Sequence, residues 1–402
     1  MDNKKNGIPK LRFPGFTGAW EQRKLGEVAT RVTRKNKNLE STLPLTISAQ
    51  LGLVDQISYF DKRIASSNLT NYILLNRGEF AYNKSYSNGY PFGAVKRLNR
   101  YDKGVIPSLY IAFMPNTIFI NSDFMEMYFE TSLWHKEVSA RASEGARNHG
   151  LLNISPSDFM DIYMKIPEKI EEQKKIAKFL EDFDSLIALH QRKLEHLQEQ
   201  KKGLLQKMFP KNGETVPEVR FPGFTDAWEQ RKLGEVVKIT MGQSPSSKNY
   251  TDNSSDYILV QGNADMKNGR VVPRVWTTQI TRQAEKGDLI LSVRAPVGDI
   301  GKTDYDVVIG RGVAAIKGNE YIFQILTKMN NSGYWTRFST GSTFESINSS
   351  NIRNAQIMIP KDDEQTKIGH FLSRFDSLIA LHQRKLDHLE LMKKGLLQQM
   401  FV

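Results

Sequence analysis

The sequence predicts two mixed α/β (α+β) domains joined by two long, antiparallel coiled-coil helices. The chain contains the same structural unit twice, as indicated by two internal repeats and by the difference between the segments that separate them. Residues 172–209 match residues 364–401 at 28 of 38 positions, and residues 11–28 match residues 219–236 at 16 of 18 positions. The segments that lie between the repeats do not resemble one another. We therefore expect an internal pseudo-twofold repeat that carries two different domains.

The repeat that ends each half predicts a long helix with a packing seam. Both copies contain the unchanged run FDSLIALHQRKL, at 183–194 and at 375–386. Apolar residues recur there at alternating steps of three and four, which is the heptad pattern of helices that pack side by side. The expected seam residues are Leu180, Phe183, Ile187, His190, Leu194, Leu197, Leu372, Phe375, Ile379, His382, Leu386 and Leu389. A helix over 171–208 is about 57 Å long at 1.5 Å per residue.

Polar residues interrupt the seam at matching places in both copies. His190 and His382 either fix the register of the helices, as buried polar seam residues can, or lie close together at the dyad of an antiparallel pair. Lys201 and Lys393 are expected to extend out of the seam into water. An antiparallel pair carries the two inserts at opposite ends, whereas a parallel pair would carry both at one end, and the antiparallel arrangement is favoured.

The inserts, about 29–165 and 237–358, are predicted to be compact α/β domains with short strands and irregular loops. Strands are expected over 72–75, 110–113, 257–260 and 288–293, with Asn-Gly turns at 87–89 and 267–269. One helix is expected in each insert, over 122–142 and 321–338. Each insert leaves through a hydrophobic strand into Pro167 or Pro360, and the acidic residues that follow suit a helix N-terminus.

These elements divide the chain into five segments. They are a leading motif with its domain over 1–166, a spacer helix over 167–209, a linker over 210–218, a second leading motif with its domain over 219–359, and a second spacer helix over 360–402. The leading motifs contain Trp20 and Trp228 beside a pair of phenylalanines. These aromatic residues either pack on the helix ends or form a docking surface for a partner, and the sequence leaves both open.

The charge balance favours a polyanionic partner. The chain has 56 Lys and Arg against 44 Asp and Glu, a net charge of +12, and each cation near a phosphate releases condensed counterions. The alternative is that this charge serves only solubility. The chain has no cysteine, which excludes disulfides, thiolate zinc sites and cysteine nucleophiles and fits a reducing compartment. No signal-peptide core and no apolar run of about 20 residues occurs, so we expect a cytoplasmic protein without a membrane partner.

Sequence motifs for catalysis are missing. An adenine methyltransferase needs a loop of the N/D-P-P-Y/F kind, and the sequence has no Pro-Pro pair. Gly301-Lys302-Thr303 is similar to the end of a phosphate-binding loop, but Pro296 stands where the first glycine is needed. The seven histidines form no HExxH motif, and Ser244 lacks the spacing of a nucleophile elbow. These absences argue against a self-contained endonuclease or methyltransferase.

The two leading motifs and the two long helices form a duplicated frame around unlike inserts. This indicates that the frame makes the same contacts twice, whereas the two inserts bind two different targets. With a basic chain, the simplest target is duplex DNA with two different half-sites. The layout of the whole chain resembles the specificity (S) subunit of type I restriction-modification systems. The resemblance is carried by the motif Trp20–Gly26 and its copy Trp228–Gly234, and by the Ile-Pro and Glu-Gln signatures over 166–176 and 359–368.

The resemblance implies a non-catalytic subunit that recognises a split, asymmetric DNA sequence with two target-recognition domains. It also implies docking of two methyltransferase (M) subunits, which methylate adenine, and of restriction (R) subunits for cleavage. S-adenosylmethionine, ATP and Mg²⁺ are then expected on those partners and no cofactor on this chain, in the cytoplasm of a bacterium or archaeon. A coiled-coil adaptor that binds only proteins is the alternative, favoured if the insert surfaces are acidic.

Residue types that suit base edges gather in Gly- and Asn-rich stretches of the inserts. Arg and Lys suit guanine, Asn and Gln suit adenine, and Ser or Thr suit either. The candidates in the first insert are Lys84, Tyr86, Asn88, Arg141, Arg147, Asn148 and His149. The candidates in the second insert are Ser244, Ser246, Lys248, Arg294, Arg311, Ser342, Thr343 and Ser346. The alternative is that these stretches are ordinary polar surface loops.

Overall fold

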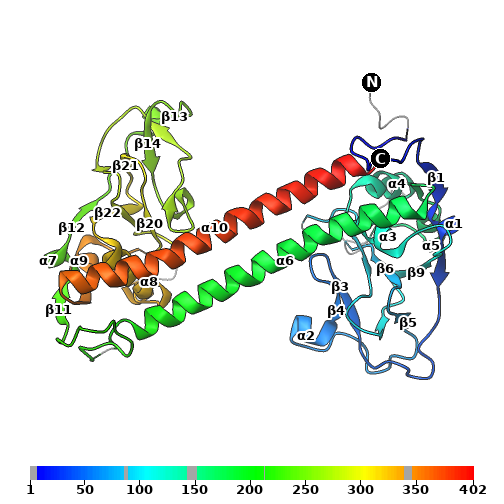
Figure 1. Cartoon of the computed structure of the whole chain (residues 1–402), viewed down its shortest axis with the longest axis horizontal. Helices are drawn as coiled ribbons and strands as arrows, with labels where there is room; N and C mark the ends of the chain where they lie inside the picture. The colour runs from blue at the N-terminus through cyan, green and yellow to red at the C-terminus, as the bar shows by residue number, and fades with distance from the viewer. Residues whose placement is uncertain (1–6, 86–88, 143–151, 212, 339–345) are drawn as a thin grey trace. The chain divides into compact units, whose positions relative to one another are not determined.

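The computed structural model describes residues 7–85, 89–142, 152–211, 213–338 and 346–402. The chain forms two compact units, Met1–Ala188 with Asp387–Val402, and Leu189–Leu386. Each unit therefore contains residues of both long helices, α6 (Ile170–Lys207) and α10 (Asp362–Met400) (Figure 1). Seven candidates lie outside the described residues, namely Tyr86, Asn88, Arg147, Asn148, His149, Ser342 and Thr343.

The first unit is built around a four-stranded antiparallel sheet in the order β2-β9-β6-β7. Its strands are β1 (Glu21–Lys24), β2 (Ala29–Val32), β3 (Leu45–Ser48), β4 (Gly52–Asp55), β5 (Ile73–Asn76), β6 (Phe80–Asn83), β7 (Ala94–Arg97), β8 (Lys103–Ile106), β9 (Ile111–Pro115) and β10 (Tyr163–Ile166). Its helices before α6 are α1 (Leu25–Val28), α2 (Gln56–Phe60), α3 (Ser122–Phe129), α4 (Leu133–Arg141) and α5 (Pro156–Met160). Smaller two-stranded sheets pair β3 with β4 and β5 with β8.

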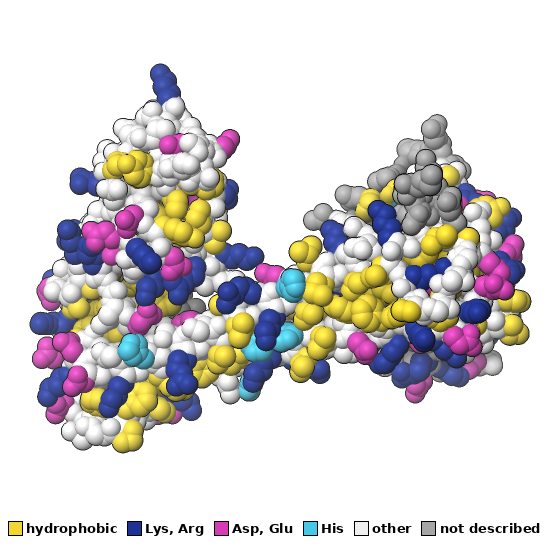
Figure 2. All heavy atoms as spheres, turned by 45° about the horizontal axis from the view of Figure 1, so that its top comes forward, with side chains coloured by type: hydrophobic (Ala, Val, Ile, Leu, Met, Phe, Trp, Pro, Cys, Tyr) yellow, Lys and Arg dark blue, Asp and Glu magenta, His cyan; other side chains and the backbone are white. Residues whose placement is uncertain are grey.

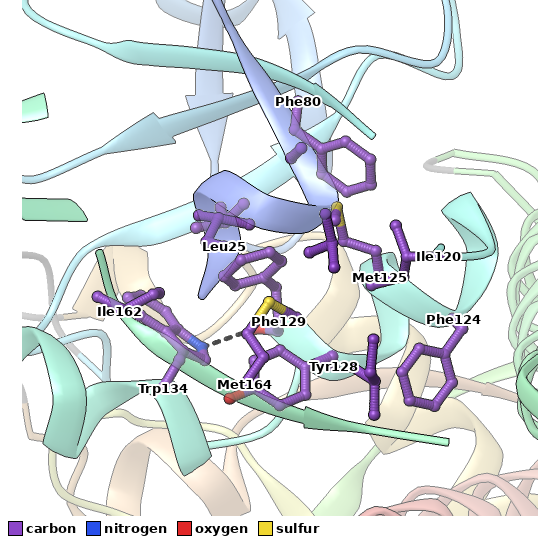
Figure 3. Packing of buried hydrophobic residues seen from close by; sticks show 14 of the residues in the cluster. Leu25, Phe80, Ile120, Phe124, Met125, Tyr128, Phe129, Trp134, Ile162 and Met164 are labelled. Atoms are coloured by element: carbon purple, nitrogen blue, oxygen red, sulfur yellow. Dashed lines mark hydrogen bonds between the residues drawn. The ribbon is translucent and has the colours of Figure 1, made fainter. Parts of the chain in front are cut away.

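The core of the first unit lies between this sheet and α3, α4 and β10. Figure 3 shows Tyr128 and Phe129 of α3 packed with Trp134 of α4 and Met164 of β10. The indole nitrogen of Trp134 donates a hydrogen bond to the carbonyl of Phe129 at 3.1 Å, so the aromatic side chain is buried without an unpaired donor. This core fixes the strand that leads into α6.

The single helix expected over 122–142 is two helices. Asn121 caps α3, because its side chain accepts a hydrogen bond from the backbone of Phe124. At the break, the hydroxyl of Thr131 donates to the carbonyl of Tyr128 and accepts from the backbone of Leu133. A threonine side chain that bonds to nearby backbone competes with helix continuation, which the apolar periodicity did not reveal.

The second unit carries two larger sheets, of six strands (β12-β22-β19-β20-β16-β15) and of five strands (β13-β17-β14-β21-β18). Its strands are β11 (Glu229–Lys232), β12 (Lys238–Met241), β13 (Tyr250–Thr251), β14 (Tyr257–Val260), β15 (Met266–Lys267), β16 (Arg270–Val271), β17 (Trp276–Thr277), β18 (Gln283–Ala284), β19 (Leu289–Ser292), β20 (Ile300–Lys302), β21 (Val307–Ile309), β22 (Val313–Lys317) and β23 (Gln356–Ile359). Its helical segments before α10 are α7 (Leu233–Val236), η3 (Ser247–Asn249), η4 (Asn263–Asp265), α8 (Glu320–Asn331), η5 (Thr336–Phe338) and α9 (Ser349–Arg353).

Local signals predicted the strands of both inserts well. Each of the four expected strands is present, and none of its ends is shifted by more than two residues. The turn Asn268-Gly269 joins β15 to β16 with positive φ at both residues, as a tight hairpin turn requires. The helix expected over 321–338 ends at Asn331, because Gly333 takes a left-handed conformation with φ of 68°.

The leading motif pairs with the exit strand in the same register in both units. Glu21 of β1 lies opposite Ile166 of β10, and Glu229 of β11 lies opposite Ile359 of β23, both antiparallel. The sequence did not predict this pairing. It closes each insert at its base and places the insert on the first turn of a long helix.

The tryptophans of the leading motifs are packing residues. Trp20 is buried against Phe124 and Phe401, edge to face in both contacts. Trp228 is buried in the same way against Phe209 and Tyr321. Of the two interpretations of these aromatic residues, packing on the helix ends therefore holds for the tryptophans.

Segments of α6 and α10 run antiparallel within each unit. In the second unit, Lys201 of α6 pairs with Asp376 of α10 at 2.5 Å, and in the first unit Asp184 of α6 pairs with Lys393 of α10 at the same distance. The expectation that these lysines extend into water is wrong, because an aspartate on the facing helix supplies a countercharge within reach. Among the described residues, no helix is both long and apolar enough to cross a lipid bilayer.

The seam residues expected from the heptads lie along these paired segments. His190 and His382 lie together in the second unit, with their Nδ1 atoms 2.8 Å apart. The five fully buried members are all leucines. They are Leu180, Leu194, Leu197, Leu372 and Leu386. The half-buried members are Phe183, Ile187, His190, Phe375, Ile379, His382 and Leu389.

Candidate nucleic-acid interface

A groove in the second unit brings together candidates from three separate stretches of the second insert. It encloses about 810 Å³ and is lined by Ser244, Ser246, Arg294 and Arg311. Ser244 and Ser246 follow β12, Arg294 follows β19, and Arg311 lies in the turn between β21 and β22. The sequence supplied the residue types, and the sheet topology brings them to one concave surface.

Backbone contacts hold these loops against one another. The backbone nitrogen of Gly310 donates to the carbonyl of Val260 at 2.7 Å, and that of Arg311 donates to the hydroxyl of Ser244 at 3.0 Å. At Gly312 a side chain is impossible without movement, because a Cβ there would lie 1.9 Å from the carbonyl oxygen of Gln261. A wall that contains such close backbone approaches is well fixed, and side chains mounted on it are held in position.

The two arginines of the groove are available to a ligand. Arg294 and Arg311 are exposed, and neither side chain forms an ion pair or hydrogen bond with another described residue. A guanidinium group presents five donors in a rigid fork, which suits guanine or phosphate. Arg294 is also held through its backbone, which forms an isolated β-bridge with Ser346.

Lys248 and Ser346 lie close in sequence to groove residues but do not line the groove. Lys248 is exposed on the short helix η3. Ser346 borders residues that are not described, and its structural role here is the bridge to Arg294. The predicted contact of each with DNA stays a prediction.

The described candidates of the first unit are engaged in internal contacts. The ammonium group of Lys84 donates to the carbonyl of Ile154 at 3.2 Å. Arg141, in the last turn of α4, pairs with Glu137 at 2.6 Å and lies over the ring of Tyr163. Both side chains therefore stabilise the fold of the first unit, and a contact with DNA would compete with these interactions.

Sequence reasoning missed several groove residues that suit base recognition. Gln261 and Asn263 line the groove from the turn after β14, and Arg274 lines it beyond β16. The signal for the first two was present, since Gln-Gly-Asn directly follows the strand predicted over 257–260. The sequence does not identify these two residues as groove residues, because nothing local indicates that their turn faces the Arg311 turn.

The described residues give no sign of a metal centre, since they contain no group of three or more His, Asp and Glu side chains placed to hold an ion. The surface charge is mixed. On the face drawn in Figure 2, Lys and Arg side chains lie among Asp and Glu side chains on both units. The inserts are therefore not uniformly acidic on that face, which was the feature that would favour a purely protein-binding adaptor.

The family assignment follows from sequence comparison. Residues 94–199 and 225–391 match the family model of the type I restriction modification DNA specificity domain. The chain belongs to this family. The fold class expected from the sequence is confirmed, as is the resemblance to specificity subunits.

Two similar proteins come from Methanocaldococcus jannaschii. The protein named as the specificity subunit of the type I restriction enzyme MjaX is 31% identical over 247 residues, which cover 58% of each chain. The specificity subunit of the type I restriction enzyme MjaVIII is 23% identical over 293 residues, which cover 68% of each chain. The present chain thus spans a little over half the length of the first of these relatives.

Two solved structures share the fold. One belongs to a type I R-M system and has a TM-score of 0.56 and 20% identity, covering 97% of this chain and 98% of that chain. The other is the S subunit of the type I restriction-modification system from M. genitalium, with a TM-score of 0.65 and 15% identity, covering 98% of this chain and 99% of that chain. At these identities the likeness concerns the fold.

Proposed function

We propose that this chain is the DNA-recognition subunit of a type I restriction-modification complex and carries no catalysis of its own. It binds a split, asymmetric DNA target, one half-site per recognition domain. The groove of the second unit carries this proposal, because free guanidinium groups of Arg294 and Arg311 share one surface with the hydroxyls of Ser244 and Ser246. These groups suit base edges and phosphates in a DNA groove.

The duplicated frame supports docking of two copies of one partner, the M subunit. Leu186 of α6 and its counterpart Leu378 of α10 are each 44% exposed. Leu189 and its counterpart Leu381 are also exposed. Large apolar side chains that stay exposed at equivalent places in both copies suit burial against a protein. The R subunits join this assembly for cleavage.

The partner subunits supply the chemistry in this proposal. S-adenosylmethionine is bound by the M subunits, and ATP and Mg²⁺ by the partners that methylate or cleave. The complex acts on chromosomal and incoming DNA, which places it in the cytoplasm of a bacterium or archaeon. The absence of cysteine fits such a reducing compartment.

Methylation mapping tests the proposal. The chain is expressed with the M subunit of its own system in a host that lacks adenine methylation, and methyladenine is mapped across the genome. We expect one asymmetric motif with two specified halves and an unspecified spacer. No methylation, or a continuous motif, contradicts the proposal.

Exchange of one insert tests the assignment of one half-site to each domain. Residues 29–165 are replaced by the corresponding insert of another family member, and the frame is left unchanged. We expect one half of the methylated motif to change and the other half to persist. A change in both halves contradicts the assignment, and the result identifies which half belongs to the second unit.

A further inference from the structure

A buried carboxylate lies in the wall of the groove in the second unit. The side chain of Asp265 is only 3% exposed. Its Oδ2 accepts hydrogen bonds from the backbone nitrogens of Gln261, at 2.7 Å, and Gly262, at 3.3 Å, and its Oδ1 accepts from Nε of Arg274 at 3.0 Å. A buried carboxylate is costly unless it is paired and hydrogen-bonded, so these contacts fix the position of the three groups that make them.

The turn held by Asp265 is clamped from its other side as well. Gly310 donates to the carbonyl of Val260, the residue before the turn, and Gly312 lies against the carbonyl of Gln261. The turn over 261–263 is therefore fixed between a buried carboxylate and the backbone of the Arg311 turn. Side chains on it have defined directions, which is a requirement for discrimination between bases.

This turn places two residues with carboxamide side chains in the lining of the groove. Gln261 and Asn263 line it, both are half-buried, and neither side chain has a hydrogen-bond partner among the described residues. A carboxamide has a donor and an acceptor side by side. It matches the acceptor N7 and the donor N6 of adenine in the major groove, where Asn and Gln bind bidentately.

We propose that Gln261 and Asn263 recognise an A·T base pair in the half-site bound by the second unit, and that Asp265 is the residue that positions them. This inference rests on the proposed function and adds the class of base pair to it. Arg274 completes the arrangement, because its pairing with Asp265 ties the segment after β16 to the same carboxylate. Asp265 itself is buried behind the turn and acts through Gln261 and Asn263.

The test uses the purified complex of the full chain with its M subunits. Binding is measured to duplexes that carry the mapped site and to duplexes in which each base pair of the second half is replaced in turn. The variants are Gln261→Ala, Asn263→Ala and Asp265→Asn. Asn331→Ala serves as matched control, because it removes an exposed carboxamide at the end of α8, outside the groove.

We expect Gln261→Ala or Asn263→Ala to lose discrimination at one A·T pair by roughly 5- to 150-fold, the usual range for one bidentate base contact. Asp265→Asn reduces discrimination at the same base pair. Discrimination in the other half-site, the spacer length and the affinity for unrelated DNA stay as in the wild type and in Asn331→Ala. A role of Asp265 in folding alone would instead weaken binding to every duplex by the same factor, with no selective loss at one base pair.

The outcomes separate this inference from the proposed function. A wild-type complex that prefers no defined DNA site contradicts the proposed function itself. A defined site whose second half contains no A·T pair overturns the inference and leaves the proposed function standing. The same holds if Gln261→Ala and Asn263→Ala both change discrimination at every position by less than about twofold, which is below the range expected for a lost base contact.

Discussion

At the residue scale, the duplicated frame repeats one buried ion pair. Nε and a terminal nitrogen of Arg220 bind the two carboxylate oxygens of Glu364 at 2.7 and 2.8 Å, and Arg12 binds Glu172 in the same way at 2.7 and 2.9 Å. Glu364 is 1% exposed and Arg220 is 12% exposed. Each pair ties a leading motif to the first turn of a long helix, and it is built from residues that are identical in the two copies.

Removal of one partner of this pair should destabilise the second unit strongly. Glu364→Gln leaves the guanidinium of Arg220 without its countercharge in a largely buried place, and such a loss typically costs about 3 kcal/mol or more. The free energy of unfolding, measured with urea for the full chain, checks this. Asp226→Asn is the matched control, because Asp226 pairs with Lys361 in the same segment but both side chains are exposed. Equal losses for the two variants would contradict the argument.

The residues of the groove show how far the sequence predicts a site. Arg294 and Arg311 were recognisable because arginine suits guanine and both residues lie in predicted turns. Gln261 was not, because its place in the groove depends on the parallel pairing of β14 with β21, which brings two distant turns together. Lys84 has a suitable side chain, but the carbonyl that binds it is 70 residues away in sequence. The sequence shows the type of each residue, but whether its side chain lines the groove or makes an internal contact depends on tertiary structure.

At the element scale, the long helices were the most predictable part of the fold. The helix expected over 171–208 is observed over Ile170–Lys207. The prediction is accurate because the apolar periodicity that indicates a helix is local and is repeated over many turns. The pairing of β1 with β10 was not predictable, since each is a short strand whose partner lies at the other end of the insert. Strand pairing of this kind depends on the tertiary structure of the whole domain, so the local sequence of either strand does not indicate its partner.

The histidine pair of α6 and α10 predicts a pH dependence of the stability of the helix pair. Burial lowers the pKa of His382, and the neighbouring His190, Lys385 and Lys193 lower it further. The folded chain therefore resists protonation of this imidazole, whereas the unfolded chain takes up the proton near the ordinary pKa of about 6.5. Stability should fall as the pH drops from about 6.5 towards the lower pKa of the folded state.

Melting temperatures at pH 7.5 and pH 5.5 check this prediction. The variant His190→Gln with His382→Gln keeps a polar pair in the seam and removes the titration of His382. We expect the loss of stability between the two pH values to be smaller in the double variant than in the wild type. All other titrating groups are common to the two proteins, so an identical loss in both would show that this pair does not contribute.

At the scale of the whole molecule, the phenylalanine that follows each long helix packs on the tryptophan of a leading motif. Phe401, after α10, packs on Trp20 in the first unit, and Phe209, after α6, packs on Trp228 in the second unit. The frame therefore makes the same packing contact in each unit, which is a physical reason why its two copies are nearly identical in sequence. The inserts are under no such constraint, and their sheets differ in strand number and order.

Because α6 and α10 each contribute residues to both units, their length is expected to set the spacing of the half-sites. Deletion of 186–192 together with 378–384 removes one heptad from each helix and preserves the seam pattern. It shortens each helix by about 10.5 Å, which corresponds to about three base pairs of DNA. Three base pairs also turn the second half-site by about 100° around the DNA axis, so the shortened frame no longer fits the original site. Methylation mapping should then find a motif with a shorter spacer or no methylation, whereas full methylation of the wild-type motif would show that the helices do not set the spacing.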